Sequence, residues 1–202
     1  MRSRSFQVGP DPAGTPPEAV GPRLSVDRIV DVAIDQMRAH GYDAVTMRSI
    51  ARELGTGPAS LYAHVANRDE LDQRVVGRVC AQWHIPDPDP ERWDTQVRES
   101  MIGLLTLFRA NPGVARCTLG MVSLDAGLLQ VTDRLLALLA AGGVSDQHAA
   151  WFIDVGCLYV ASVAVEEDIW RERAAPPRPA GEERFAFGVE LLVTGLRELA
   201  GD

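Results

Sequence analysis

The stretch VTMRSIARELGTGPASLYAHVANRDEL, residues 45–71, decides the fold of this chain. Its first part is typical of a short helix. Thr46 can cap that helix, because its hydroxyl can accept a backbone N–H while Ile50 and Leu54 recur on one helical face. Gly55 falls where a helix often ends in a left-handed residue. The stretch therefore begins with a helix from Thr46 to about Leu54.

A second helix follows almost at once. Gly57 and Pro58 suit its N-cap and first helical position, because the fixed φ of proline fits a first turn. We expect this helix to run from Pro58 to about Val65. Two short helices joined by a tight, glycine-containing turn are the pattern of a helix-turn-helix unit.

The second helix has one apolar face and one small, polar face. At about 100° per residue, Leu61 and Val65 point toward a core. A surface helix more usually carries long charged side chains on its free face, whereas this composition indicates a close approach to another molecule. In a major groove, hydroxyls can reach phosphates or base edges, and alanine methyls can meet thymine methyls. The outward positions are Ala59, Ser60, Tyr62 and Ala63.

The stretch resembles the DNA-binding core of the TetR family of bacterial regulators. The matching residues are Thr46-x-Arg48-x-Ile50-Ala51-x-x-Leu54-Gly55, then Leu61-Tyr62-x-His64-Val65, then Asn67-Arg68-x-x-Leu71. The resemblance covers residues 24–84, and beyond them only the helical layout. It departs from the family at Gly57 and Ala63, where many relatives carry larger contact residues. The expected DNA contacts are Arg48, Thr56, Pro58, Ala59, Ser60, Tyr62, Ala63, His64 and Arg68.

The charge of the chain is unevenly distributed. The 202 residues carry a net charge of −8, but residues 23–78 balance eight Arg against eight acids, so the excess lies in residues 79–202. Phosphate contact needs only a local basic patch. We expect that patch around the turn, where Arg48, Arg52 and Arg68 cluster.

No membrane or redox function is indicated by the sequence. No run approaches the ~20 apolar residues of a membrane span, and no secretory signal is evident, so we expect a cytoplasmic protein without a membrane partner. Cys80, Cys117 and Cys157 are far apart, which is typical of buried free thiols.

The DNA-binding unit is predicted to occupy residues 23–67. Residues 1–22 contain five prolines and three glycines and little that could be buried, which predicts a disordered arm. Ser25 can cap a helix with an apolar stripe that ends at Gly41. This helix closes the core of the unit, and the resemblance makes Tyr42 a packing residue.

A connecting helix is predicted over residues 68–85. Asn67 can cap it, with Glu70 at the third helical position. Its buried face includes Trp83, and the prolines from Pro86 onward must end it. Because this helix touches both units, it is the expected lever between them.

Residues 86–202 form the second predicted domain, and the fold class is all-α. No segment alternates with period two, so no sheet is expected. Turn signals rich in glycine and proline separate the segments with helical pattern. The expected helices span 92–110, 113–119, 123–141, 145–173 and 182–200.

The second domain is expected to bind a small hydrophobic effector. Ligand pockets are mostly apolar with a few polar groups, and Asp154 is the first choice for a contact, because a buried charge needs a partner. The same residues could instead fill a core. The candidate lining residues are Trp83, Met101, Leu105, Arg116, Leu128, Trp151, Asp154 and Tyr159.

A homodimer is expected because the helix from Ser145 is apolar almost all round and the last helix is similar. Packing them against a second copy as a four-helix bundle would bury both, and small residues permit a close approach. The alternative is a monomeric bundle in which the glycines only fill space. The expected interface residues are Gly156, Val160, Val163, Gly188, Leu192 and Gly195.

These patterns together predict a DNA-binding transcriptional regulator. We expect a repressor that binds a palindromic operator in double-stranded DNA and is released by the effector. The alternative is a DNA-binding dimer whose second domain serves only dimerisation or protein docking. Catalytic spacing, a metal cluster and a cofactor motif are not found, so we expect no enzyme, metal or cofactor. The operator, the regulated genes and the effector cannot be read from the sequence.

Overall fold

The computed structural model describes residues 24–119, 121, 126–174, 176 and 180–200. The regular elements within these residues are all helices, so the predicted all-α class is confirmed. The arm predicted over residues 1–22 and the loop positions 177–179 lie outside the described part.

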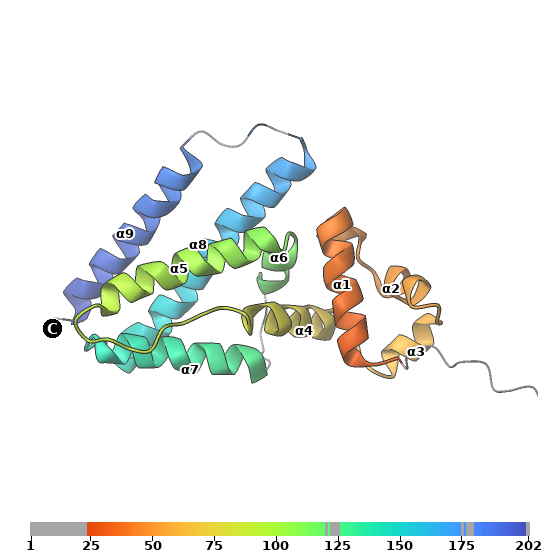
Figure 1. Ribbon diagram of the computed structural model, residues 1–202, viewed down its shortest axis with the longest axis horizontal. Helices are drawn as coiled ribbons and strands as arrows, with labels where there is room; N and C mark the ends of the chain where they lie inside the picture. Colours follow the sequence, from red (N-terminus) through yellow and green to blue (C-terminus); the bar gives the residue numbers. More distant parts are fainter. Residues whose placement is uncertain (1–23, 120, 122–125, 175, 177–179, 201–202) are drawn as a thin grey trace, which may run out of the picture.

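The N-terminal unit contains α1 (Val26–His40), the short 3-10 helix η1 (Tyr42–Ala44), α2 (Met47–Glu53) and α3 (Pro58–Tyr62). Figure 1 shows α1, α2 and α3 together at one end of the molecule. As predicted, the Ser25 hydroxyl caps α1. The helix ends at Gly41, whose φ of 81° favours glycine.

The turn between α2 and α3 forms as the sequence predicts. Thr46 caps α2 in a reciprocal arrangement: the Ser49 N–H donates to the Thr46 hydroxyl oxygen at 3.0 Å, and the Thr46 N–H donates to the Ser49 hydroxyl oxygen at 2.9 Å. Gly55 has a left-handed φ of 65°. The predicted end of α3 at Val65 is wrong, because the His64 N–H donates to the Leu61 carbonyl and tightens the chain into a turn after Tyr62.

The connecting helix α4 (Arg68–Cys80) is shorter than predicted. Asn67 caps it as expected and accepts the Glu70 N–H at 2.8 Å. Past Cys80 the chain turns, and the Trp83 indole N–H donates to the Ser100 carbonyl at 2.9 Å. This bond fixes the end of the connecting segment to the next helix.

The second unit is a bundle around one long helix. It contains α5 (Trp93–Ala110), α6 (Val114–Thr118), α7 (Ala126–Ala141), α8 (Asp146–Glu172) and α9 (Gly181–Ala200). Helix α8 packs against α5, α6, α7 and α9, and α4 enters the bundle beside α6 and α7. The observed bounds agree with the predicted helices to within a few residues, although residues 122–125 lie outside the described part.

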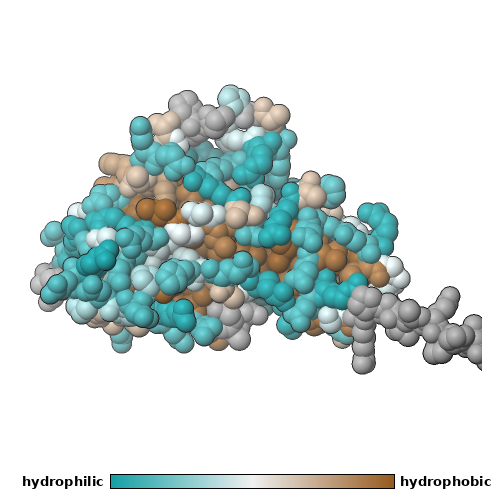
Figure 2. Space-filling view, in the orientation of Figure 1, coloured by the Kyte–Doolittle hydropathy of each residue, from teal (hydrophilic) through white to brown (hydrophobic). Residues whose placement is uncertain are grey.

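Helix α8 is the one described helix that is long and apolar enough, by length and composition alone, to cross a membrane. The core helix of a soluble protein passes the same test. Here one side of α8 is buried inside the protomer, while another side exposes Trp151 and Val155. Figure 2 shows a molecular face that is mainly hydrophilic, with hydrophobic side chains in separate patches.

Candidate DNA-binding surface and effector cavity

Helix α3 presents its polar face to solvent. Leu61 and Val65 are fully buried and hold the segment on the core, whereas the Tyr62 side chain is 52% exposed. Because the two anchors are buried, the outward side chains are presented on a fixed backbone. The exposed candidates around this helix are Pro58, Ala59, Ser60, Tyr62, Ala63 and His64, with Thr56 half-exposed.

Two arginines on α2 supply positive charge next to α3. Arg48 and Arg52 are exposed, and within the described residues neither side chain makes an ion pair or hydrogen bond. An arginine that is not engaged elsewhere can pair with a phosphate in a bidentate manner. This pair is therefore suited to contact a DNA backbone beside α3.

The prediction that Arg68 contacts DNA disagrees with the structure. Its Nε donates to Asp72 Oδ1 at 2.7 Å, and Nη1 donates to the Val45 carbonyl. The guanidinium also lies 4.3 Å from the centre of the Tyr42 ring. These contacts turn Arg68 into the unit, where it joins α4 to the segment before α2.

A cavity of about 310 Å³ lies between α4, α5, α7 and α8. This volume lies at the lower end of the range of small-molecule pockets. Most of its wall is aliphatic or aromatic, and three sulfur-containing side chains contribute. The lining residues are Val76, Cys80, Trp83, Leu104, Phe108, Thr118, Met121, Leu128, Val131, Thr132, Leu135, Ala150, Ile153, Asp154, Cys157 and Leu158.

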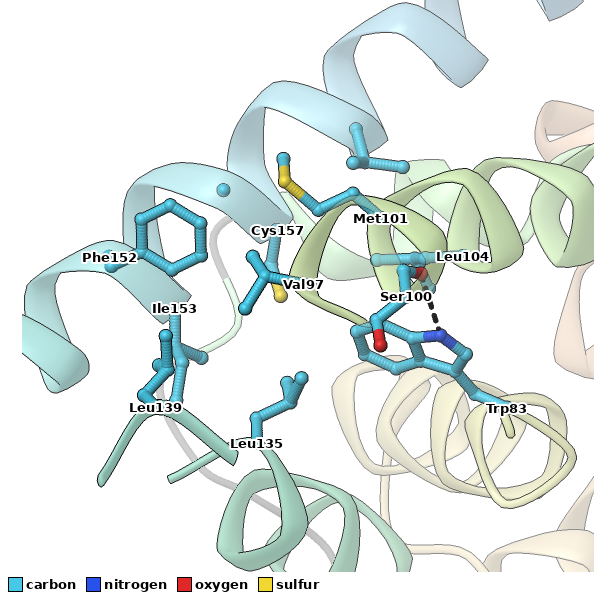
Figure 3. A pocket seen from close by; sticks show the side chains of 12 residues that line it. Trp83, Val97, Ser100, Met101, Leu104, Leu135, Leu139, Phe152, Ile153 and Cys157 are labelled. Atoms are coloured by element: carbon cyan, nitrogen blue, oxygen red, sulfur yellow. Dashed lines mark hydrogen bonds between the residues drawn. The ribbon is translucent and has the colours of Figure 1, made fainter. Parts of the chain in front are cut away.

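A smaller hollow of about 20 Å³ continues inward from this cavity. The two share Trp83, Ile153 and Cys157, among others. Figure 3 shows Trp83 with its bond to the Ser100 carbonyl, and Met101 and Phe152 on the other side of the hollow. A rotation of Met101 or Phe152 can therefore change the depth of the cavity.

Four of the eight predicted pocket residues line these hollows. Trp83, Leu128 and Asp154 line the larger hollow, and Met101 lines the smaller one. A hollow of about 490 Å³ at the junction between the two units is larger, but charged side chains such as Arg171 line it. The apolar cavity is therefore the better candidate for an effector.

The other four predicted pocket residues lie elsewhere. Leu105 is part of the buried core and lines neither hollow. Trp151 is 58% exposed on an outer face of α8. Tyr159 stacks on Phe185 with ring centres 5.7 Å apart, which joins α8 to α9. Their spacing along apolar helices could not show which side faces the cavity.

Arg116, the fourth, bridges the two units instead of lining the cavity. Its guanidinium lies 3.0 Å from Asp43 in η1 and 3.2 Å from Glu172 in α8. Because Thr118, two residues later on α6, lines the cavity, one short helix connects the cavity wall to the DNA-binding unit.

A buried polar cluster strengthens this junction. The Tyr42 hydroxyl donates to Asp72 Oδ2 at 2.7 Å, and Cys117 Sγ of α6 lies 3.6 Å from Asp72 Oδ1. Burial and the hydrogen bond to Asp72 raise the pKa of Tyr42 to about 12. Helices α4 and α6 therefore meet η1 at the carboxylate of Asp72, which accepts the hydrogen bond of Tyr42.

Two cysteines contribute to the cavity wall, which the sequence did not indicate. Burial raises the pKa of Cys80 to about 12 and that of Cys157 to about 11. Both are thus neutral thiols at neutral pH. No group of three or more His, Cys, Asp or Glu in the described part of the chain is arranged to hold a metal.

The predicted dimer residues on α8 face the interior of the protomer. Val160 and Val163 are buried within the protomer, and Gly156 lies against Met101. Gly188 of α9 packs on Tyr159 of the same chain. These positions serve packing inside one protomer.

A different apolar face lies on the outside of α8 and α9. Phe187 is 65% exposed and Leu191 is 59% exposed, and the spacing of four residues aligns them along α9. Between the two helices the surface forms a groove of about 270 Å³, and two of the expected interface residues, Leu192 and Gly195, line it. The large exposed hydrophobic side chains of this face are Trp151, Val155, Phe187, Leu191 and Leu199.

A helix-turn-helix unit with an outward second helix, joined to a helical domain with an apolar cavity, defines the class of DNA-binding regulators that carry their own ligand-binding domain. Residues 29–75 match the family model for bacterial regulatory proteins of the TetR family. Residues 85–182 match that for the tetracyclin repressor-like C-terminal domain.

Similar proteins of known structure agree with this class. The structure of the TetR family protein ActR from Streptomyces coelicolor in complex with actinorhodin is 32% identical, with 90% of this chain and 100% of that chain covered and a TM-score of 0.79. The structure of BioQ with its double-stranded DNA operator is 26% identical, with 87% and 99% covered and a TM-score of 0.70. The chain belongs to the TetR family.

The curated relatives include repressors. The transcriptional repressor DrrR1 of Streptomyces coeruleorubidus is 27% identical over 145 residues, which cover 71% of this chain. The match spans only 54% of the length of DrrR1.

Proposed function

We propose that this chain is a homodimeric transcriptional repressor that places two copies of α3 in successive major grooves of a palindromic operator. The observation that carries this proposal is the exposed Tyr62 between two fully buried anchors, Leu61 and Val65. Arg48 would fix the DNA backbone beside α3. The operator complex of BioQ supports this role.

The exposed face of α8 and α9 supports the dimer. A contiguous apolar face on a protein surface marks an interaction site, and a second copy would cover it with the same side chains by twofold symmetry. The resulting four-helix bundle would set the separation of the two α3 helices. Binding of both half-sites therefore depends on this face.

The cavity supports release by a small molecule. Its wall includes Cys80 at the end of α4 and Thr118 of α6. Both helices reach the DNA-binding unit, α4 through the bond between Asp72 and Tyr42 and α6 through Arg116. A ligand that favours another arrangement of α4 and α6 would change the separation of the α3 helices. A tenfold loss of DNA affinity corresponds to ~1.4 kcal/mol of coupling. The ActR complex with actinorhodin supports such a site.

The proposed role requires no catalytic step, and it places the protein in the cytoplasm with the chromosome. It is tested by fluorescence anisotropy with a DNA duplex enriched from a random-sequence pool. We expect Tyr62→Ala to weaken binding at least several-fold without unfolding the protein, because Tyr62 is 52% exposed and lies outside the buried core.

The matched control is Leu129→Ala, which removes a similarly exposed hydrophobic side chain from α7, far from α3 in sequence. This variant should bind the duplex as the unmodified protein does. An unchanged affinity of Tyr62→Ala would count against the assignment of α3 to the groove.

A further inference from the structure

Apart from the weakly donating thiols of Cys80 and Cys157, the polar groups of the effector cavity offer a ligand only acceptors. The Thr118 hydroxyl donates to the Ala115 carbonyl at 2.7 Å, and the Thr132 hydroxyl donates to the Leu128 carbonyl at 2.9 Å. The Trp83 indole N–H is likewise taken by Ser100. The hydroxyls thus keep only lone pairs for a ligand, so the wall favours a ligand that brings its own hydrogen-bond donors.

Asp154 is the one formal charge among the described lining residues. It lies exposed on α8, at the rim of the cavity, and within the described residues its carboxylate makes no ion pair or hydrogen bond. The two thiols of the wall are neutral, because burial raises the pKa of Cys80 and Cys157. No Arg or His from the described part lines the cavity to compensate this carboxylate or to receive an anion.

We propose that the effector of this chain is a lipophilic cation, with an apolar ring system inside the cavity and a protonated amine paired with Asp154 at its rim. This inference rests on the proposed function and specifies the ligand class of its cavity. An anionic ligand would be placed next to an uncompensated carboxylate, which is unfavourable where water is partly excluded. A cation instead forms a charge-assisted hydrogen bond with Asp154.

The rest of the wall suits such a molecule. Trp83 and Phe108 are aromatic, and aromatic rings attract both flat ring systems and cations. Leu104 and Leu135 continue the apolar wall into the smaller hollow. The amine would remain near water while the ring system is buried, which limits the cost of desolvating the charge.

The test uses the full-length dimer and three probes that share a naphthalene ring and a two-carbon arm. These are naphthylethylamine, a cation at neutral pH, naphthylethanol, which is neutral, and naphthylpropanoate, an anion. Isothermal titration calorimetry should show the amine binding tightest, and about tenfold tighter than the anion or more. Equal affinities, tighter binding of the anion or no binding of the amine would overturn the proposal.

The variant Asp154→Asn removes the charge with little change in shape. We expect it to weaken binding of the amine about tenfold and to leave the affinity for naphthylethanol unchanged. The control Asp133→Asn makes the same change at an exposed site of α7 that does not line the cavity, and it should bind all probes normally. An unchanged preference for the amine in Asp154→Asn would refute the role of this carboxylate.

The same probes separate this inference from the proposed function. If the amine binds through Asp154 but leaves the affinity for DNA unchanged, the cavity takes a cationic ligand, and the proposal that the ligand releases the protein from DNA is refuted. If naphthylpropanoate releases the protein from DNA and the amine has no effect, release by a small molecule is supported, and the proposal of a cationic ligand is refuted.

Discussion

The dimer face can be tested with a single charge on α9. Leu191→Asp places a carboxylate in the centre of the exposed apolar face, where Leu191 is 59% exposed in the protomer. Because the side chain makes few contacts within its own chain, the variant should fold normally. In a symmetric dimer the substitution appears twice, which doubles its effect.

The expected magnitude follows from the area that the dimer would cover. Complete burial of a leucine contributes ~1.5–3 kcal/mol, so the exposed part of Leu191 corresponds to ~1–2 kcal/mol per protomer and ~2–4 kcal/mol per dimer. A tenfold change in the dissociation constant requires ~1.4 kcal/mol. The dissociation constant of the dimer should therefore rise at least ~30-fold, before the cost of burying two unpaired carboxylates is added.

Sedimentation velocity over a dilution series measures this constant, and circular dichroism checks that the helices remain. The matched control is Ile102→Asp, because Ile102 is 53% exposed but lies on α5. The control should remain dimeric. A Leu191→Asp protein with the dissociation constant of the unmodified chain, or an equally weakened Ile102→Asp dimer, would refute the proposed face.

Two further predictions concern the DNA-binding unit and its junction. Arg48→Ala should weaken binding to all duplexes alike and lower the salt dependence by about one counterion per half-site, whereas Arg68→Ala should mainly reduce the free energy of unfolding, because it breaks the contacts with Asp72 and Val45. Salt titrations and urea unfolding distinguish them, and a full salt slope in Arg48→Ala would contradict the assignment. The pKa of Tyr42, raised from 10.0 to about 12, favours the protonated phenol in the folded state, so its contribution is present below pH 10 and is lost as the pH rises through 12. The difference in unfolding free energy between the unmodified protein and Tyr42→Phe should therefore shrink over this range, and a constant difference would show that Tyr42 does not titrate there.

Local signals in the sequence were sufficient for the helices. Thr46, Gly55 and Pro58 specify the boundaries of α2 and α3 through capping, a left-handed residue and a fixed φ. These effects act over only a few residues, so they can be read from the adjacent sequence. Helix α4 ends instead before Trp83, where the Gln82 and Trp83 N–H groups donate to the Val79 and Cys80 carbonyls in a tighter turn that the apolar pattern does not reveal.

The directions of side chains on α8 and α9 were not predictable in the same way. A helix with apolar residues on several sides does not show which side faces its own core and which faces a partner. The sequence therefore predicted Gly156 and Val160 at the interface, whereas in the structure Trp151 lies on the exposed side of α8. The relative rotation of packed helices decides this, and it depends on residues distant in sequence.

The cavity and the role of Arg68 show the same limit. Leu105 and Leu128 are both apolar residues on helices, but only Leu128 faces the cavity. Asp72, four residues after Arg68, was a visible signal for an intrahelical ion pair.

The arrangement of the two α3 helices is tested most directly by selecting duplexes from a random-sequence pool with the unmodified dimer and sequencing what is bound. Two outward helices related by twofold symmetry predict an inverted repeat with half-site centres one helical turn, ~34 Å, or somewhat more apart. Enrichment of a single half-site, of direct repeats or of no sequence at all would contradict the account.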